Sequence, residues 1–560
     1  MKTILSGMLR PSRIACTLWS AALLLFLSAS SQAAGPFIPG GVQDDAGLLR
    51  MGERMYIEGI LPSGEPMLAV VKGDIEVEGT AFTCASCHLR SGLGAVEGGV
   101  ITPPTNGKTL FQPLKAYYKY VEVKSAPPRR PAYTDETLAE LLRAGVDPAG
   151  NALGDVMPRY LLDDRDMAVL IRYLKSLSSE LSPGATDESI RLGTVISEDV
   201  SPEFRDAMLA HIEKFVNDKN KQAGISPYRM QARRQSSYLT LSLAKWILKG
   251  PPETWRAQLE EYNRNEPVFA LAGGITTGEW KPVHDFCEEN HIPCLFPITD
   301  FPVVSETGWY TLYQSKGYYQ EGESAARFLN GADEALKGGT VVQVVRDTRE
   351  GRALSAGFEK TWLEMGHARP ATVMLKPGEG LSGDFLKGLQ AGEKPATVML
   401  WDGPEAVTAL KSFASSDNMP GMVFVASGYL GKSLYMLDEK AREFTYITYP
   451  FRLPEDEEKK KVYIPLVKGA EFHGDALTVM KRTYAVIPLL TRTLLEMKGN
   501  YYRDNFLDVI GMMMDMDMAP LYERLSFGPG QRYASKGCYI VQLTKGPKPV
   551  LVKKSGWVIH

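Results

Sequence analysis

The sequence predicts two folded regions of different class, a smaller all-α domain followed by a two-lobed α/β domain with parallel sheets. Over residues 44–182, apolar residues recur at the three- and four-residue steps of amphipathic helices. From residue 190 onward, short apolar runs alternate with helical patterns, as in parallel sheets that helices cover on both faces. A run rich in Pro, Gly and small polar residues separates the two patterns and predicts a linker over 183–189.

The first 33 residues have the pattern of an export signal. A basic start precedes an apolar run over 14–27, and a small-x-small cleavage sequence ends at Ala33. We therefore expect a signal peptide over 1–33 and a periplasmic mature chain that does not span the membrane. A retained membrane anchor is the alternative, but the run is shorter than the roughly 20 residues of a spanning helix.

Composition limits the classes of partner. The chain has 560 residues, of which 44% are hydrophobic and 23% charged, and it predicts a globular protein of about two to four domains. Its 63 Lys and Arg against 66 Asp and Glu leave a formal charge of -3, which offers no basic field for nucleic acid. No acyl-transfer, hydrolase or phosphate-loop pattern stands out in the larger domain, and we expect no enzyme.

Three helices are expected in the smaller domain. The first has an apolar face around Met55, on which the small Gly52 would allow a close helix crossing. Thr134 caps a second helix that ends at Gly145, and the last helix has an apolar stripe over 167–177. The first and last helices are expected to bracket the domain.

The sequence Cys84-Ala85-Ser86-Cys87-His88 carries most of the chemical information. Each cysteine can add to one vinyl group of a porphyrin, and the histidine that follows is then held beneath the iron. We predict one covalently attached haem c, with His88 as an axial ligand. A zinc site would need a second pair of ligands nearby, and a redox dithiol would need a strand-to-helix junction, neither of which the surrounding sequence offers.

The second axial ligand is predicted to be Met157. His88 is the only histidine between the start of the mature chain and His211, so ligation by two histidines of this domain is excluded. Met157 precedes a proline in a loop just before the last helix. Met167 is the alternative, although its place in the apolar stripe favours the core.

The arrangement of a first and a last helix around this motif resembles the class I cytochrome c fold, and the resemblance covers residues 44–182. In that family the distal methionine is often followed by proline, which again implies Met157. The resemblance implies a carrier of single electrons at fairly high potential, because a thioether ligand favours ferrous iron. With both axial positions filled, catalysis at the iron would require loss of a ligand.

The larger domain is expected to repeat a strand-helix unit. Ser201 caps a helix that begins with proline, and another helix is expected over 279–290. The expected strands cover 190–195, 268–272, 293–296, 341–345, 371–375, 396–401 and 423–426.

Three stretches of this domain, 268–278, 292–297 and 319–322, resemble type I periplasmic binding proteins of the branched-chain amino-acid receptor kind. The likeness covers residues 190–545 and leaves a C-terminal tail over 546–560. It implies a ligand cleft between two lobes, where helix N-termini bind an amino acid or small carboxylate. The resemblance places these candidate residues at the cleft, although each could equally be a turn or cap residue: Thr276, Thr277, Glu350, Trp401 and Asp402.

The remaining sulfur-containing residues lie in the larger domain. Cys287 and Cys294 are predicted to form a disulfide, with two buried thiols as the alternative, and Cys538 is expected unpaired in a buried strand. The methionine-rich run 512–518 could bind Cu(I), but packing at a helix or interface is the preferred interpretation.

These features predict a periplasmic monohaem electron carrier with a fused ligand-binding or docking module. Its redox partner would be a periplasmic dehydrogenase or a component of a respiratory chain. The alternative is a solute-binding receptor or sensor whose haem reports redox state, and an enzyme that uses haem in catalysis is a third hypothesis.

Overall fold

A computed structural model describes the chain from residue 45 to residue 559. Residues 73, 98–99, 115–128, 224–238, 333–339, 382–396, 416–419, 461–463, 465–466, 468–470, 514 and 518 lie outside the described part. The predicted signal peptide also lies outside it. Within the described part, no helix is long and apolar enough to cross a membrane. The contacts discussed below belong to the compact unit formed by residues 49–560.

The N-terminal module, residues 49–182, has the predicted close crossing of its first and last helices. Helix α1 (Asp45–Glu58) meets α5 (Asp164–Ser176) at Gly52, where an added Cβ would lie 2.5 Å from Cβ of Tyr173. Between them are α2 (Cys84–His88), α3 (Gly107–Leu110) and α4 (Asp135–Ala144). As predicted, the Thr134 side chain caps α4 and Gly145 ends it in the left-handed conformation.

This module also contains short strands, so the all-α prediction is wrong in that respect. A three-stranded sheet has the order β2-β1-β5, and β3 pairs with β4. Strands β1 and β2 pair antiparallel, and each contains β-branched residues, Val70 and Val71 in β1 and Ile75 and Val77 in β2. The strands are β1 (Leu68–Val71), β2 (Ile75–Glu78), β3 (Ala95–Glu97), β4 (Val100–Thr102) and β5 (Arg159–Tyr160).

The first lobe contains a five-stranded, all-parallel sheet in the order β10-β9-β8-β6-β7. Its strands are β6 (Ser189–Ser197), β7 (Thr240–Leu248), β8 (Ala270–Ala272), β9 (Cys294–Leu295) and β10 (Thr311–Leu312). Helices α6 (Pro202–Ala223), α7 (Trp255–Asn265) and α8 (Lys281–Glu289) accompany them. The sheet confirms the predicted parallel arrangement, although the sequence analysis did not identify β7.

The second lobe has an eight-stranded sheet whose first five strands, in the order β12-β11-β13-β14-β15, are parallel. Strand β16 then pairs antiparallel with β15, and β17 and β18 pair with β16. The predicted C-terminal tail over 546–560 is therefore wrong, because β17 and β18 complete the sheet. The strands are β11 (Val341–Arg346), β12 (Ala371–Leu375), β13 (Thr397–Trp401), β14 (Met422–Ala426), β15 (Thr445–Tyr449), β16 (Gly537–Leu543), β17 (Leu551–Lys553) and β18 (Val558–Ile559).

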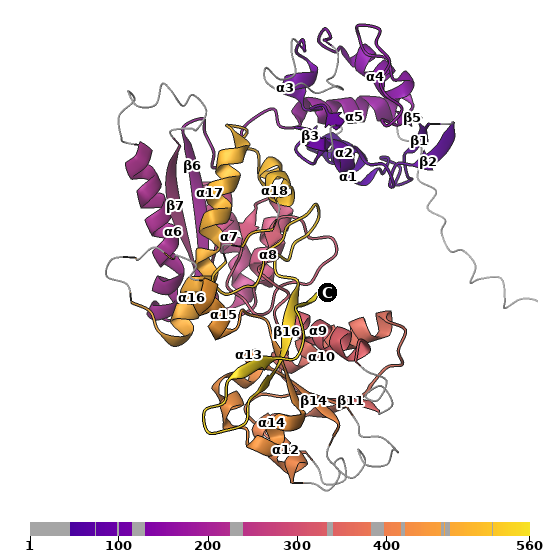
Figure 1. Cartoon of the computed structure of the whole chain (residues 1–560). Coiled ribbons are helices and arrows are strands. Elements are labelled where there is room, and N and C mark those ends of the chain that lie inside the picture. Colours follow the sequence, from indigo (N-terminus) through magenta and orange to yellow (C-terminus); the bar gives the residue numbers. More distant parts are fainter. Residues whose placement is uncertain are drawn as a thin grey trace, which may run out of the picture. The chain divides into compact units, whose positions relative to one another are not determined.

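The chain passes between the two lobes several times. It enters the second lobe before α9 (Tyr318–Asn330) and returns to the first lobe through α15 (Pro454–Lys460). In Figure 1 the orange helices α16 (Gly474–Tyr484) and α17 (Val486–Met497) lie beside α6, which is far from them in the sequence. Helix α18 (Arg503–Gly511) also packs in the first-lobe core before the chain re-enters the second lobe at β16. The remaining second-lobe helices are α10 (Arg349–Glu364), α12 (Ala406–Ala414), α13 (Ser427–Leu430) and α14 (Glu439–Phe444).

Candidate functional site

The Cys84–His88 motif forms the short helix α2, which begins where the Thr83 side chain accepts the Ser86 N–H. His88 is only 6% exposed, and its Nδ1 lies 2.8 Å from the carbonyl oxygen of Pro103. If Nδ1–H donates to that oxygen, Nε2 is left with its lone pair available to a metal. Burial also lowers the pKa of His88, which favours the neutral imidazole that ligation needs. The motif therefore fits an axial histidine.

The thiol of Cys84 is unlike that of a redox dithiol. Burial raises its pKa to about 11, whereas reactive thiols in C-x-x-C motifs have lowered pKa values. Its Sγ lies 3.9 Å from the hydroxyl of Tyr160, which donates a hydrogen bond to the carbonyl of Phe82. Among the described residues, no group of three or more His, Cys, Asp or Glu could hold a metal ion. The raised pKa of Cys84 disfavours a redox dithiol.

Met157 lies in a half-buried loop immediately before β5. Its backbone is held at both ends, because its N–H donates to the carbonyl of Gly154 and its own carbonyl accepts from Arg159. Tyr160, three residues later, contacts Cys84, so this segment runs close to the motif. Met167 is 2% exposed in the stripe of α5, which agrees with its expected place in the core. The Met157 sulfur remains a predicted ligand.

A cleft of about 670 Å³ is lined by residues of both lobes. The starts of four helices contribute to its wall: Ser201 before α6, Tyr318 of α9, Arg349 of α10 and Asp475 of α16. Helix N-termini carry unpaired N–H groups and a partial positive charge. Side chains cap neither α9 nor α16. The partial positive charge of these helix starts favours an anionic ligand, and the carboxylates of Asp300 and Asp475, which also line the cleft, oppose it.

Aromatic rings and two ionisable groups complete the cleft. Glu321 is buried and accepts a 2.6 Å hydrogen bond from the Thr448 hydroxyl, and burial raises its pKa to about 8. Arg482 donates to Asp300 at 2.8 Å and to the carbonyl of Thr299 at 2.8 Å, so its guanidinium is already engaged by the protein. The rings that line the cleft are Phe204, Phe301, Tyr318, Phe451 and Tyr522.

The structure separates the five predicted cleft residues into two groups. Thr276 and Thr277 line the cleft, and Thr277 donates its hydroxyl to Asp199. Glu350 is not part of the lining, whereas its neighbour Arg349 is. Trp401 and Asp402 are also misplaced by the prediction. Sequence position locates a residue at a strand or helix end, but it does not tell which way the side chain points.

Trp401 and Asp402 have structural partners inside the second lobe. The indole of Trp401, 0% exposed, donates to Gln343 at 2.9 Å. Both carboxylate oxygens of Asp402 accept from Arg346 at 2.8 Å. The sequence analysis did not name several ionisable residues that line the cleft, among them Arg349, Glu321 and Arg482. Of these three, only Glu321 lies within one of the stretches on which the family resemblance rested, residues 319–322.

Cys287 and Cys294 are free, fully buried thiols in the structure, so the predicted disulfide is not present. Both belong to an apolar cluster of the first lobe, where thiols pack as small hydrophobic groups. Cys538 is buried on β16, as expected. Met513 and Met516 belong to the first-lobe core, which agrees with packing as the role of the methionine run.

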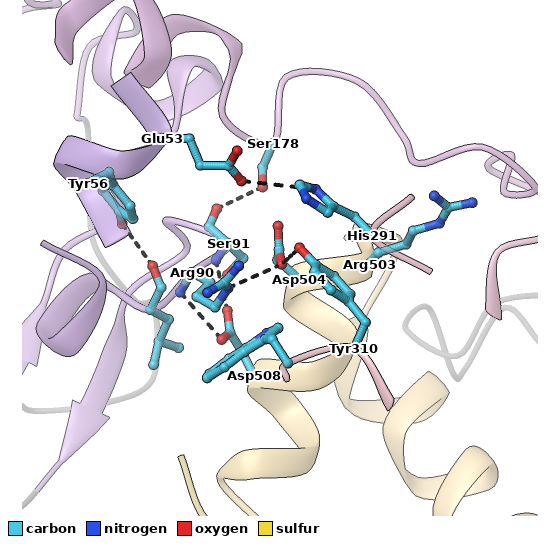
Figure 2. A network of polar contacts seen from close by, with 12 residues as sticks. Glu53, Tyr56, Arg90, Ser91, Ser178, His291, Tyr310, Arg503, Asp504 and Asp508 are labelled. Atoms are coloured by element: carbon cyan, nitrogen blue, oxygen red, sulfur yellow. Dashed lines mark hydrogen bonds and ion pairs between the residues drawn. The ribbon is translucent and has the colours of Figure 1, made fainter. Parts of the chain in front are cut away.

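Figure 2 shows a polar network between the N-terminal module and the first lobe. The N–H groups of Arg90 and Ser91 donate to the two carboxylate oxygens of Asp508, at 3.4 and 2.9 Å. The Arg90 side chain forms an ion pair with Asp504 at 3.7 Å, and the Tyr310 hydroxyl donates to the same carboxylate at 2.8 Å. Burial raises the pKa of Asp508 to about 6. Helix α18, which supplies both aspartates, therefore joins the module to the lobe.

Comparisons with known proteins concern the larger domain. Residues 249–467 match the family described as periplasmic binding protein. A search of curated proteins finds no match. That family match and the sheet topology together support a two-lobed α/β fold of periplasmic-binding-protein type.

Similar solved structures include an ABC transporter substrate-binding protein from Sphaerobacter thermophilus, with 15% identity and a TM-score of 0.45 over 66% of this chain and 98% of that chain. A branched-chain amino acid ABC transporter from Thermus thermophilus with bound valine has 12% identity and a TM-score of 0.42, over 67% and 97%. A solute-binding protein from R. palustris in complex with benzoate has 12% identity and a TM-score of 0.42, over 66% and 96%.

Proposed function

We propose that this protein is a periplasmic solute-binding receptor whose N-terminal module carries a covalent haem. The observation that supports the receptor assignment most is the convergence of four helix starts on one cleft between the lobes. The family match supports it as well, because the matched residues include much of that cleft. The receptor therefore takes precedence over the carrier that the motif alone favoured.

The proposed ligand is a small organic carboxylate such as an amino acid. Its carboxylate would lie near the starts of α9 and α16, which no side chain caps. The N–H of Tyr318 already donates to the carbonyl of Asp300 at 3.4 Å, so α16 would supply most of the free N–H groups. Its apolar part would lie against the rings of Phe301 and Tyr318, whose centroids are 5.4 Å apart. Glu321 is protonated near neutral pH, so it adds a hydrogen-bond donor and no opposing charge.

The haem would be held by Cys84 and Cys87 through thioether bonds, with His88 and Met157 as axial ligands. A haem so held supplies reversible one-electron chemistry at iron. The chain's own contribution is positional: the carbonyl of Pro103 orients the His88 ring, and Arg159 holds the loop of Met157. A periplasmic redox partner would exchange the electron with the haem. The oxidation state of the haem would then report the redox state of the periplasm to the receptor.

Two measurements test this proposal separately. Mass and absorbance of protein from a host competent in haem attachment should show one added haem with a low-spin spectrum; an unmodified, colourless chain would end the haem part. Calorimetry against amino acids and small carboxylates should find a ligand that binds with 1:1 stoichiometry. Rapid reduction by a periplasmic dehydrogenase with no ligand found would instead favour the electron carrier.

A further inference from the structure

A second cavity, of about 250 Å³, lies between the N-terminal module and the first lobe. Ala85, Ser86 and Leu89 line it from the side of α2. In a helix, positions 84, 87 and 88 share one face, and positions 85, 86 and 89 turn away from it. The cavity therefore lies behind the predicted haem-binding face, and it shares no lining residue with the cleft between the lobes.

Three buried N–H groups around this cavity make no hydrogen bond to another described residue: Nε of Arg90, Nε1 of Trp309 and Nε of Arg532. Nε of Arg90 is nevertheless ion-paired, 3.7 Å from the Asp504 carboxylate, so the donors without a polar partner in the described part of the chain are those of Trp309 and Arg532. Arg532 is only 5% exposed. Both guanidinium groups lie over the Trp309 ring, with their carbons 4.4 and 4.0 Å from its centroid. Buried donors without acceptors are destabilising and rare in native proteins.

The carboxylates nearby already have other partners. Glu288 accepts the backbone N–H groups of residues 309–311 at 2.6 to 3.0 Å. Asp508, which itself lines the cavity, accepts two backbone N–H groups through its two carboxylate oxygens. Asp504 accepts from Tyr310 and pairs with Arg90. Arg532 has no ion pair in the described part of the chain. Burial, and then the charge of Arg90, lower the pKa of Arg532 to about 10, while the carboxylates of Glu288 and Asp508 act in the opposite direction.

We propose that this cavity is a second binding site, for a small organic carboxylate. The carboxylate oxygens would accept from Arg532 and Trp309, whose donors have no acceptor among the described residues, and would lie near the Arg90 guanidinium. A short aliphatic body would contact the apolar part of the wall, formed by Ile57, Leu507 and Met512. Because Arg90 belongs to the module and Arg532 to the first lobe, an occupied site would hold the two together. This site does not depend on a ligand in the cleft.

The test follows the Trp309 indole N–H directly. Full-length protein labelled with ¹⁵N-tryptophan is titrated with butyrate under reducing conditions, and Trp309→Phe assigns the resonance by its loss. We expect a saturable shift of this resonance at millimolar butyrate. Arg532→Gln should weaken the binding at least about tenfold, since it removes a charged donor. Arg349→Gln, which alters an arginine of the cleft, should leave the shift unchanged.

Several results would overturn the proposal. A resonance that does not move with butyrate would mean that water satisfies the two donors. Equal binding by Arg532→Gln would place the ligand elsewhere, and a shift with inorganic phosphate but not with butyrate would reject the carboxylate. If Arg532→Gln does not fold, Arg532→Lys replaces it: lysine keeps the charge but loses the planar fork, and it should bind more weakly than arginine.

Discussion

The proposed haem site and the proposed ligand cleft are built in opposite ways. The haem motif is five consecutive residues on one short helix, with a supporting carbonyl 15 residues away at Pro103. The cleft combines residues from Ser201 to Tyr522, which several passages of the chain between the lobes bring together. A site that depends on covalent spacing can be recognised from the sequence, whereas a site that depends on long-range packing cannot.

The largest expected effect concerns the motif. Cys87→Ser removes one of the two proposed thioether bonds. The double variant Cys84→Ser/Cys87→Ser removes both and should abolish covalent haem attachment. Denaturing mass spectrometry would show the chain without the added mass of haem. Cys538→Ser, which removes a buried thiol on β16, is the matched control and should retain the haem. A double variant that keeps the haem covalently bound would refute the attachment site.

The cleft should respond to pH through Glu321. Its pKa is about 8 in the fold and near 4.5 when unfolded, so the folded state binds the proton more tightly. The stability that this proton contributes is complete below about pH 4.5 and is lost as pH rises through 8, a change of several kcal/mol. Glu321→Gln resembles the protonated form and should remove this loss.

Urea unfolding at several pH values measures the effect, and the difference between wild type and Glu321→Gln isolates it from other groups. Parallel pH profiles for the two proteins would contradict the assignment. Ligand affinity measured across the same range sharpens the comparison, because wild-type affinity should fall above pH 8 while that of the variant stays level.

The helix crossing of the N-terminal module gives an intermediate effect. Gly52→Ala places a Cβ 2.5 Å from Cβ of Tyr173 and 2.9 Å from the carbonyl oxygen of Val169. We expect a loss of about 1–3 kcal/mol in the stability of the module, as for other overpacked sites. Gly154→Ala, where nothing lies within 4 Å, is the control. Denaturation followed by circular dichroism should separate the two variants, and equal stability would reject the crossing.

The smallest expected effect compares two residues that the sequence analysis assigned to the cleft. Thr277 lines it and Glu350 does not. Thr277→Val removes one hydroxyl and should weaken ligand binding by about 0.5–1.5 kcal/mol, whereas Glu350→Gln should change affinity little. Calorimetry with the ligand of wild type measures both. A larger loss from Glu350→Gln would reverse the assignment.

Prediction from sequence succeeded where a signal is local and periodic. Strand β12 was predicted with its observed ends, and β11, β13 and β14 differ from their predictions by one residue at an end. Strand β7 was missed although it is long, and the hairpin β1–β2 was not expected in a helical module. Buried and exposed residues are mixed along β1 and β7, so these two strands lack the continuous apolar run that marked the other strands.

Charge and side-chain direction depended on tertiary structure. Asp402 looked like a cleft residue at a strand end, but Arg346, distant in sequence, takes both of its oxygens. Arg482 gave no sequence signal, yet α16 carries it to the cleft. The buried donors of Trp309 and Arg532 that make no hydrogen bond to a described residue could not be predicted either, since burial and hydrogen-bond partners are properties of the packed molecule.

The amino-acid sequence alone carried the proposed haem-attachment motif, the order of most strands and helices, and the change from a helical to an α/β pattern, because these depend on spacing along the chain. Tertiary structure alone decided which side chains line the cleft, that the last residues complete a sheet, and that α18 joins the module to the first lobe. The physical reason is that burial, side-chain direction and hydrogen-bond partners are set by residues that are close in space and far apart in sequence.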